Sequence, residues 1–423
     1  MRLLRDVLLV GFGTYGQFLV TLITLPLTAR LLGAEGVGLV AVGMSAYFLG
    51  SVLVDLGATQ YFSARVHDAD LPRVRGAYAV VRAAIFGALV VALAVGWSAG
   101  LHGAPRMLLV GAVAGGIWSL SEDWLLIGHG RFGASTAYQA AGRVTYLVIL
   151  LLALPRFPTP EVALACLGAS SSVTVAATWI DAERRIGRLQ PTVAVGSVLR
   201  TAAPVLASRL LLTGYGQGGA AAYSAVLNAA SLGVFSAADR LVRAGQSVLD
   251  PIGFALLPRM VQRSGDADFD RRVHRGAVGC VAVAVVAAAA ITVAAPLAVR
   301  VVYGSGFEQA VDLLRIMAWI LPATTLTSYV TTAVLPARRR TSTVLTGAVV
   351  GVATAGTALA ITAVTGSVLT MVLGVLVSEW AVATWFVVTA LRSPRPPSTP
   401  EVAPTHPHPP GAPPVPTTRE VSR

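Results

Sequence analysis

The chain has 423 residues, of which 55% are hydrophobic and 12% are charged, with a mean hydropathy of +0.71. Soluble domains carry about 25% charged residues, so this composition excludes an ordinary soluble enzyme and a disordered chain and predicts a polytopic membrane protein. All 32 basic residues are Arg, and the formal net charge is +12. The two cysteines, Cys166 and Cys280, lie in apolar runs, which indicates buried side chains and neither a disulfide framework nor a zinc site.

Twelve stretches of the sequence are long and apolar enough to cross a membrane as helices. They cover about residues 6–28, 37–61, 78–100, 107–128, 134–154, 161–180, 199–217, 233–257, 276–302, 310–335, 342–364 and 367–391. The first stretch is too long for a signal peptide and is not followed by a convincing cleavage site, so we expect a signal anchor. The expected fold class is an all-α polytopic membrane protein with about twelve transmembrane helices.

The loops between these stretches alternate in charge. One set carries most of the loop arginines, whereas the other carries only Arg30, Arg106, Arg156 and Arg300. Basic loops stay in the cytoplasm, so we expect both termini to be cytoplasmic. Because topology accounts for most of the positive charge, nucleic acid is not an expected partner. A chain without Lys and rich in Ala, Arg and Gly is typical of a high-GC bacterium, and we therefore expect a location in the bacterial cytoplasmic membrane.

An internal repeat divides the chain into two halves. Gly38 and Gly233 are 195 residues apart, and each is followed 17 residues later by an aspartate, Asp55 or Asp250, ahead of a basic loop. The second and eighth stretches therefore correspond, in the same orientation, as in a parallel repeat with a pseudo-twofold axis along the membrane normal. We expect an N-terminal six-helix lobe over residues 1–190 and a C-terminal six-helix lobe over residues 191–392.

The last segment, residues 393–423, has a different composition. Eleven of its 31 residues are Pro, which predicts a disordered cytoplasmic tail. His406 and His408 in this tail indicate low complexity, and we predict no metal site. Gly11, Gly13 and Gly16 fit GxGxxG, but the surrounding apolar run lacks the strand–helix–strand context of a dinucleotide site, so no cofactor is expected.

Charged residues within the apolar stretches are the most informative feature of the sequence. They are Asp55, Arg82, Glu122, Asp123, Arg143, Arg209, Asp239, Arg240, Arg243, Asp250, Asp312, Arg315 and Glu379. A charge at the bilayer centre costs about 2.5–3.5 kcal/mol on insertion scales, so these side chains must face one another or a hydrated interior. In the eighth stretch, Asp239, Arg243, Gln246 and Asp250 fall within about 60° on a helical wheel, with Ser236 alongside, which predicts a cavity-lining helix.

Several of these charges also have a purely structural interpretation. Asp239 and Arg243 have the spacing of an ion pair that holds the bundle together. Arg315 has Asp312 three residues before it, and Arg82 has a stem long enough to reach the cytoplasm. In contrast, Arg143 and Arg209 have no acidic residue at helical spacing. A hydrated cavity lined by several Arg favours a polyanion such as pyrophosphate or an acidic sugar.

Four segments resemble one known family. They are residues 29–38 (ARLLGAEGVG) with 54–57 (VDLG), residues 122–132 (EDWLLIGHGRF), residues 232–241 (LGVFSAADRL) with the following Leu257-Pro258, and residues 302–310 (VYGSGFEQA) with 335–340. The chain resembles the polysaccharide-type flippases of the multidrug/oligosaccharidyl-lipid/polysaccharide (MOP) transporter superfamily, similar to O-antigen flippases. The resemblance covers most of residues 1–391 and implies a MATE-like fold of two six-helix lobes with alternating access.

The resemblance also implies a passenger and a set of site residues. The passenger is a polyprenyl-pyrophosphate-linked oligosaccharide for cell-surface polysaccharide, and the implied partners are the bilayer and membrane proteins of polysaccharide biosynthesis. The cationic lumen of the family fits Arg143, Arg209, Arg240 and Arg243. Asp55, Asp239, Asp250 and Glu379 are candidates for coupling to H⁺ or Na⁺.

The sequence leaves other functions as alternatives. A cation-coupled small-molecule exporter of the same fold would depend on acidic residues in place of the Arg cluster. A lipid II flippase is less well matched, because residues 6–28 contain no Arg. A membrane enzyme would need a sizeable outer loop with catalytic residues, and the outer loops are short and nearly uncharged, so we predict a transporter and no enzyme.

Overall fold

The computed structural model describes residues 2–392 except 69, 188, 191–194, 263–267 and 339–342, and it contains no strand within these ranges. The predicted tail, residues 393–423, lies outside the described residues. The first half comprises α1 (Arg2–Asp55), α2 (Thr59–Ser63), α3 (Leu71–Ser98), α4 (Gly103–Ser119), α5 (Asp123–Gly128), α6 (Phe132–Ala153) and α7 (Pro160–Ile186). The second half begins with α8 (Val195–Gln217), α9 (Gly219–Tyr223), α10 (Ala229–Leu249), α11 (Pro251–Gln262) and α12 (Phe269–Val302). It continues through α13 (Gln309–Met317), the 3-10 turn η1 (Ala318–Ile320), α14 (Leu321–Tyr329), the π-helical η2 (Val330–Val334), α15 (Leu335–Ala337), α16 (Thr343–Thr365) and α17 (Val368–Arg392).

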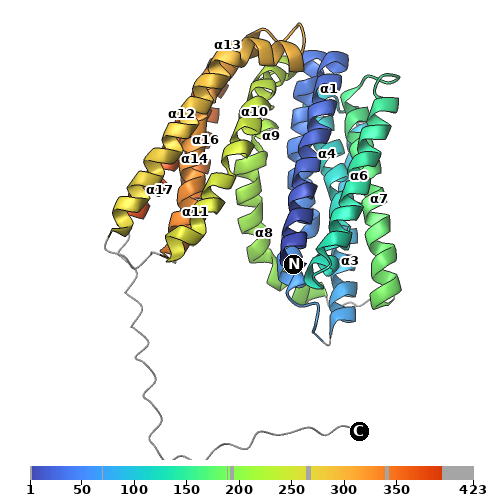
Figure 1. Ribbon diagram of the computed structural model, residues 1–423. Helices are drawn as coiled ribbons and strands as arrows, with labels where there is room; N and C mark the ends of the chain where they lie inside the picture. The colour runs from blue at the N-terminus through green and yellow to red at the C-terminus, as the bar shows by residue number, and fades with distance from the viewer. Residues whose placement is uncertain are drawn as a thin grey trace, which may run out of the picture.

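The helices run between two ends of the bundle, which we call the upper end, at α13, and the lower end, at the N-terminus (Figure 1). Within the described residues, nine helical segments are long and apolar enough to cross a membrane. The first part of α1, α8 and the α10–α11 pair supply the remaining segments expected from the sequence. The prediction of an all-helical membrane protein is therefore confirmed, whereas the lobe boundary at residues 190 and 191 stays a prediction.

The first two expected segments are joined without a loop. The backbone of α1 leaves the helical conformation at Gly33, where φ is 63° and ψ is −172°. A positive φ is adopted readily by Gly and at a cost by other residues. At this glycine the chain reverses direction at the upper end, so that the part of α1 after the kink packs against α4 and α10.

The two halves meet where α1 crosses α10. A Cβ atom added to Gly38 would lie 1.9 Å from the carbonyl oxygen of Ala229, and one added to Gly233 would lie 1.8 Å from that of Ala34. These are the two glycines paired by the sequence repeat, and residues related by a twofold axis meet one another at that axis. Small residues allow such close backbone contact between membrane helices.

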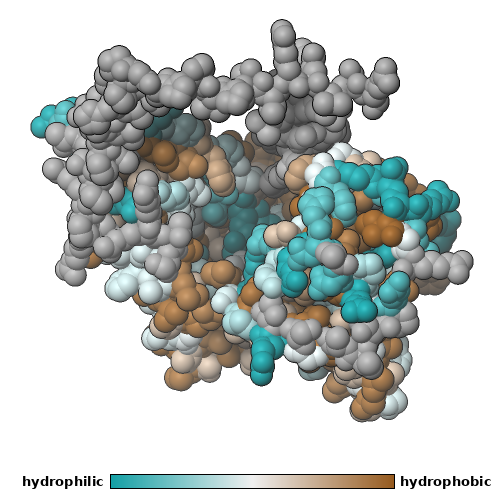
Figure 2. Space-filling model, turned by 90° about the horizontal axis from the view of Figure 1, so that it is seen from below, coloured by the Kyte–Doolittle hydropathy of each residue, from teal (hydrophilic) through white to brown (hydrophobic). Residues whose placement is uncertain are grey.

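The distribution of the core explains the shape of the molecule. At the upper end, one apolar cluster contains residues of both halves, including Val37, Leu232, Phe235 and Tyr303. Towards the lower end, one cluster around Trp124 includes only α8 from the second half, and another cluster lies within the second half. The halves are therefore joined at the upper end, and the view from below shows hydrophilic surface in a recess between them (Figure 2).

The glycine crossing gives a test of how the halves are held together. Gly38→Ala should lower the thermal stability of the purified protein, because the added methyl group must displace backbone and overpacking costs about 1–3 kcal/mol. The matched control is Gly87→Ala in α3, where an added Cβ meets no atom within 4 Å. Equal unfolding temperatures for the two variants would contradict the close crossing.

Candidate functional site

A cavity of about 1030 Å³ lies between the two halves. Helices α1, α4, α6 and α7 line it from the first half, and α8, α9, α10, α16 and α17 line it from the second. Its polar and aromatic lining includes Tyr47, Trp118, Gln139, Arg143, Tyr146, Tyr215, Gln217, Tyr223, Ser236, Asp239, Arg240, Arg243 and Glu379. A concave space with apolar and aromatic walls and a few converging polar groups is typical of a ligand site.

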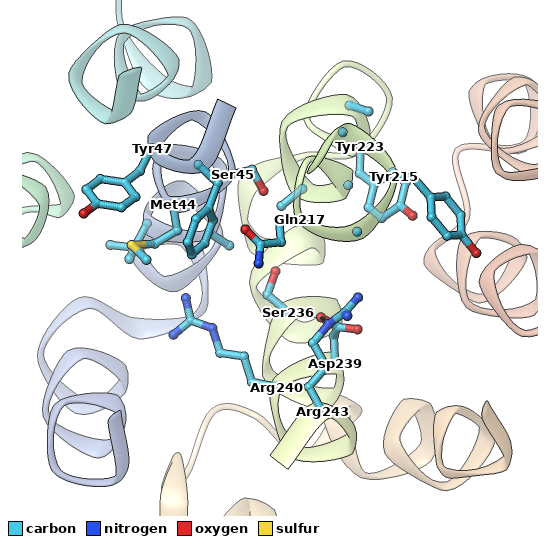
Figure 3. A pocket seen from close by; sticks show the side chains of 18 of the residues that line it. Met44, Ser45, Tyr47, Tyr215, Gln217, Tyr223, Ser236, Asp239, Arg240 and Arg243 are labelled. Carbon is cyan, nitrogen blue, oxygen red and sulfur yellow. Dashed lines mark hydrogen bonds and ion pairs between the residues drawn. The ribbon is translucent and has the colours of Figure 1, made fainter. Parts of the chain in front are cut away.

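One side of the cavity carries two arginines from different halves. Arg143 on α6 and Arg240 on α10 are both half-buried and both line the cavity. Tyr146 lies one turn beyond Arg143 on α6 and interacts electrostatically with Arg240, so this part of α6 is close to Arg240. Arg240 has no carboxylate partner among the described residues, and Figure 3 shows its guanidinium on the side of α1, towards Met44.

The other side of α10 carries an ion pair. The Nε atom of Arg243 donates to Oδ2 of Asp239 at 2.7 Å, with the predicted i,i+4 spacing. Both side chains point away from Arg240, towards the part of the cavity below Tyr223 (Figure 3). Glu379 of α17 also lines the cavity and interacts electrostatically with Arg243 and Asp239.

Three of the candidate binding and coupling residues lie outside the cavity. Arg209 does not belong to the cavity lining and donates a hydrogen bond to Gln60 Oε1, because it lies on α8 below the lining residues and faces the end of α1. Asp55 ends α1, and its Oδ1 accepts hydrogen bonds from the hydroxyls of Thr59 at 2.6 Å and Tyr78 at 2.7 Å. Asp250 is the C-cap residue of α10 and is likewise outside the lining.

The predicted polar stripe of α10 is therefore shorter than expected. Ser236, Asp239 and Arg243 line the cavity, but Gln246 and Asp250 do not. The helix ends at Leu249, and α11 begins at Pro251. The stripe therefore stops after Arg243, within α10 and before the helix itself ends.

A buried charge cluster lies outside the cavity. Glu122 is completely buried, and its two oxygens accept from Nε of Arg75 at 3.1 Å and from Nη2 of Arg82 at 2.5 Å. Arg82 Nη1 also donates to the carbonyl oxygens of Ser119 and Ser121. The interpretation that Arg82 reaches the cytoplasm is wrong, because its side chain is 1% exposed and points inward to these partners. Glu122 is thus fully engaged and unavailable to a cationic passenger.

Other charges behave as their spacing predicts. Arg315 pairs with Asp312 at 3.2 Å on the surface of α13. The amides of Gln139 and Gln217, which the sequence analysis did not single out, line the cavity. A single neutral polar residue in an apolar stretch does not show what its helix faces, so only the position of the helices identifies it as a lining residue.

Comparison with known families identifies the chain. Residues 3–264, more than half of the sequence, match a family described as polysaccharide biosynthesis protein. The chain belongs to this family. No curated protein matches the sequence.

Solved structures show which fold this family member has. The fold is similar to that of the lipid II flippase MurJ in an inward closed conformation, with a TM-score of 0.67, 11% identity, and 90% of this chain and 88% of that chain covered. It is also similar to an inward-facing multidrug resistance MATE family transporter of the MOP superfamily, with a TM-score of 0.63, 16% identity, and 88% and 94% covered. A MOP superfamily transporter from Pyrococcus furiosus, whose binding pocket is described as having reverse polarity, has a TM-score of 0.53, 16% identity, and 90% and 92% covered.

The chain is thus a member of the polysaccharide biosynthesis protein family whose fold is similar to that of membrane transporters. The expected MOP-superfamily fold is confirmed. At these identities the solved structures establish the fold alone. The binding roles of Arg143, Arg209, Arg240 and Arg243, and the coupling roles of the acidic residues, stay predictions.

The buried cluster makes a prediction about stability. Glu122→Gln should destabilise the protein strongly, because breaking a buried pair leaves two uncompensated guanidinium groups, and such a loss costs about 3–5 kcal/mol. The control is Glu161→Gln, since Glu161 is part-exposed and pairs with Arg106 at 3.7 Å, and exposed pairs contribute about 0–1 kcal/mol. Chemical denaturation in detergent measures both variants, and an equally small effect of the two would refute the structural role of Glu122.

Proposed function

We propose that the protein is a flippase that moves a polyprenyl-pyrophosphate-linked oligosaccharide across the bacterial cytoplasmic membrane for cell-surface polysaccharide biosynthesis. The observation that supports this most is the position of Arg143 and Arg240, one from each half, on the same cavity. A guanidinium presents a planar fork that suits phosphate and stays charged at any depth in the membrane. Two such groups on helices from opposite halves can bind the two phosphates of one headgroup.

The transport cycle follows from the joined upper end. In this conformation the α1–α10 crossing and the shared core close the upper end. The basic loops assign the lower end, with both termini, to the cytoplasm. The headgroup enters from the cytoplasmic leaflet, the polyprenyl chain stays in lipid, and rocking of the two lobes opens the cavity to the other side.

The energy for transport comes from a coupling cation in this proposal. Asp239 and Glu379 line the cavity and are the candidates for binding H⁺ or Na⁺ there. Asp55 and Asp250 lie outside the lining, which makes them weaker candidates. Membrane proteins of polysaccharide biosynthesis are the expected neighbours that supply the substrate.

A second candidate function is a cation-coupled small-molecule exporter. The observation that favours it is the presence of the same two carboxylates, Asp239 and Glu379, in the cavity. A lipid II flippase, in contrast, is a variant of the leading proposal with another glycan. Deleting the gene separates the two classes, because loss of surface glycan with unchanged drug efflux supports the flippase and the converse supports the exporter.

The arginines give the direct test of the flippase. In a strain that lacks the gene, Arg143→Ala/Arg240→Ala should restore less than about a tenth of the surface glycan, since each lost charge-assisted contact is worth about 1.5–3 kcal/mol. Lys at both positions should restore an intermediate amount, because it keeps the charge but loses the fork. The control is Arg315→Ala, outside the cavity, at equal membrane levels of protein. Full glycan display by the double Ala variant would end the proposal.

A further inference from the structure

The cavity is electrically divided, with different charges on its two sides. Arg240 lies on the side of α1 (Figure 3), and Arg143 lines the cavity from α6, where Tyr146 interacts electrostatically with Arg240. Asp239, Arg243 and Glu379 occupy the other side, where Arg243 pairs with Asp239 and interacts electrostatically with Glu379. With these groups ionised, the first side carries two positive charges, and the second carries one excess negative charge. The lumen is therefore not uniformly cationic.

Arg243 cannot offer its full charge to a passenger. Its Nε atom is held by Asp239 at 2.7 Å, which satisfies part of its donor fork. Glu379 accepts no hydrogen bond from another side chain or backbone group among the described residues, although it lines the cavity from α17. A carboxylate in such a place needs a donor or a cation, so the side formed by Asp239, Arg243 and Glu379 favours groups that donate hydrogen bonds.

The lining between the two sides suits sugar rings. Gln217 points into the space between α1 and α10, with Ser236 facing it (Figure 3). An amide and a hydroxyl both donate and accept, as sugar hydroxyls do. Tyr223 and Phe235 pack edge to face at 5.4 Å, and both line the cavity. Aromatic rings with polar edges bind flat, amphipathic groups well.

We propose that the cavity selects glycans whose sugars near the pyrophosphate are uncharged or carry amines, and that it discriminates against carboxylate-bearing sugars. This inference rests on the proposed function, because it assigns the pyrophosphate to Arg143 and Arg240. With the phosphates held there, the first sugars extend to the side of Asp239 and Glu379. A uronic acid at that place puts a third carboxylate beside two others, whereas hydroxyl or ammonium groups find acceptors.

Binding to the purified full-length protein in lipid nanodiscs tests the inference. The probes are a polyprenyl pyrophosphate without sugar, the same lipid linked to N-acetylglucosamine, and the same lipid linked to glucuronic acid. We expect the N-acetylglucosamine probe to bind at least about tenfold more tightly than the glucuronic acid probe, as a single unfavourable charge contact at intermediate dielectric requires. Equal or tighter binding of the glucuronic acid probe would overturn the inference.

Variants assign the discrimination to the two carboxylates. Asp239→Asn/Glu379→Gln should abolish or reverse the preference, because Arg243 then remains as an uncompensated positive charge, whereas Asp312→Asn, on the surface of α13, should leave the affinity ratio of the two sugar probes unchanged. A ratio that stays tenfold in the double variant would remove the assigned cause. The probe without sugar tests the proposed function separately. If Arg143→Ala/Arg240→Ala leaves the affinity for this lipid unchanged, the proposed pyrophosphate site is refuted.

Discussion

The cost of placing guanidinium groups inside a membrane governs this structure. A charge at the bilayer centre must find an opposite charge, a set of acceptors or water. Arg75 and Arg82 meet this requirement through Glu122 and backbone carbonyls, deep in the first half. Arg143 and Arg240 meet it differently, since they line a large cavity between the halves. The first kind of arginine stabilises the fold, and the second kind gives the cavity its affinity for an anion.

The shape of the cavity depends on how the halves are joined. At the upper end the helices α1 and α10 approach so closely that only glycines fit at the crossing, and apolar residues from both halves form one core. Towards the lower end the core of the second half is separate, and only α8 joins the core of the first half. This asymmetry leaves a wide space below the crossing, and the charged face of α10 lies along it. To open the upper end, α1 and α10 must separate at the crossing of Gly38 and Gly233. A molecule made of two equivalent halves can then close at its lower end instead.

Contacts within one helix could be predicted from the sequence, and contacts between distant helices could not. The pairing of Asp239 with Arg243 follows from i,i+4 spacing, and the membrane segments follow from hydropathy. The partners of Arg209 and Glu122 come from helices far along the chain, so hydropathy and periodicity carry no information about them. The sequence therefore predicts Arg209 in the lumen, whereas its side chain binds Gln60 on α2. The internal repeat tells more about contacts between distant helices, because its equivalent glycines, Gly38 and Gly233, lie against each other near the pseudo-twofold axis.

The most direct test of this account is a cryo-electron microscopy structure of the protein in nanodiscs with a bound polyprenyl pyrophosphate. The account predicts density for the two phosphates between Arg143 and Arg240, within hydrogen-bond distance of both guanidinium groups, with the hydrocarbon chain leaving towards lipid. Phosphate density bound elsewhere, with Arg143 and Arg240 turned to acidic neighbours in a dry and closed centre, would contradict it.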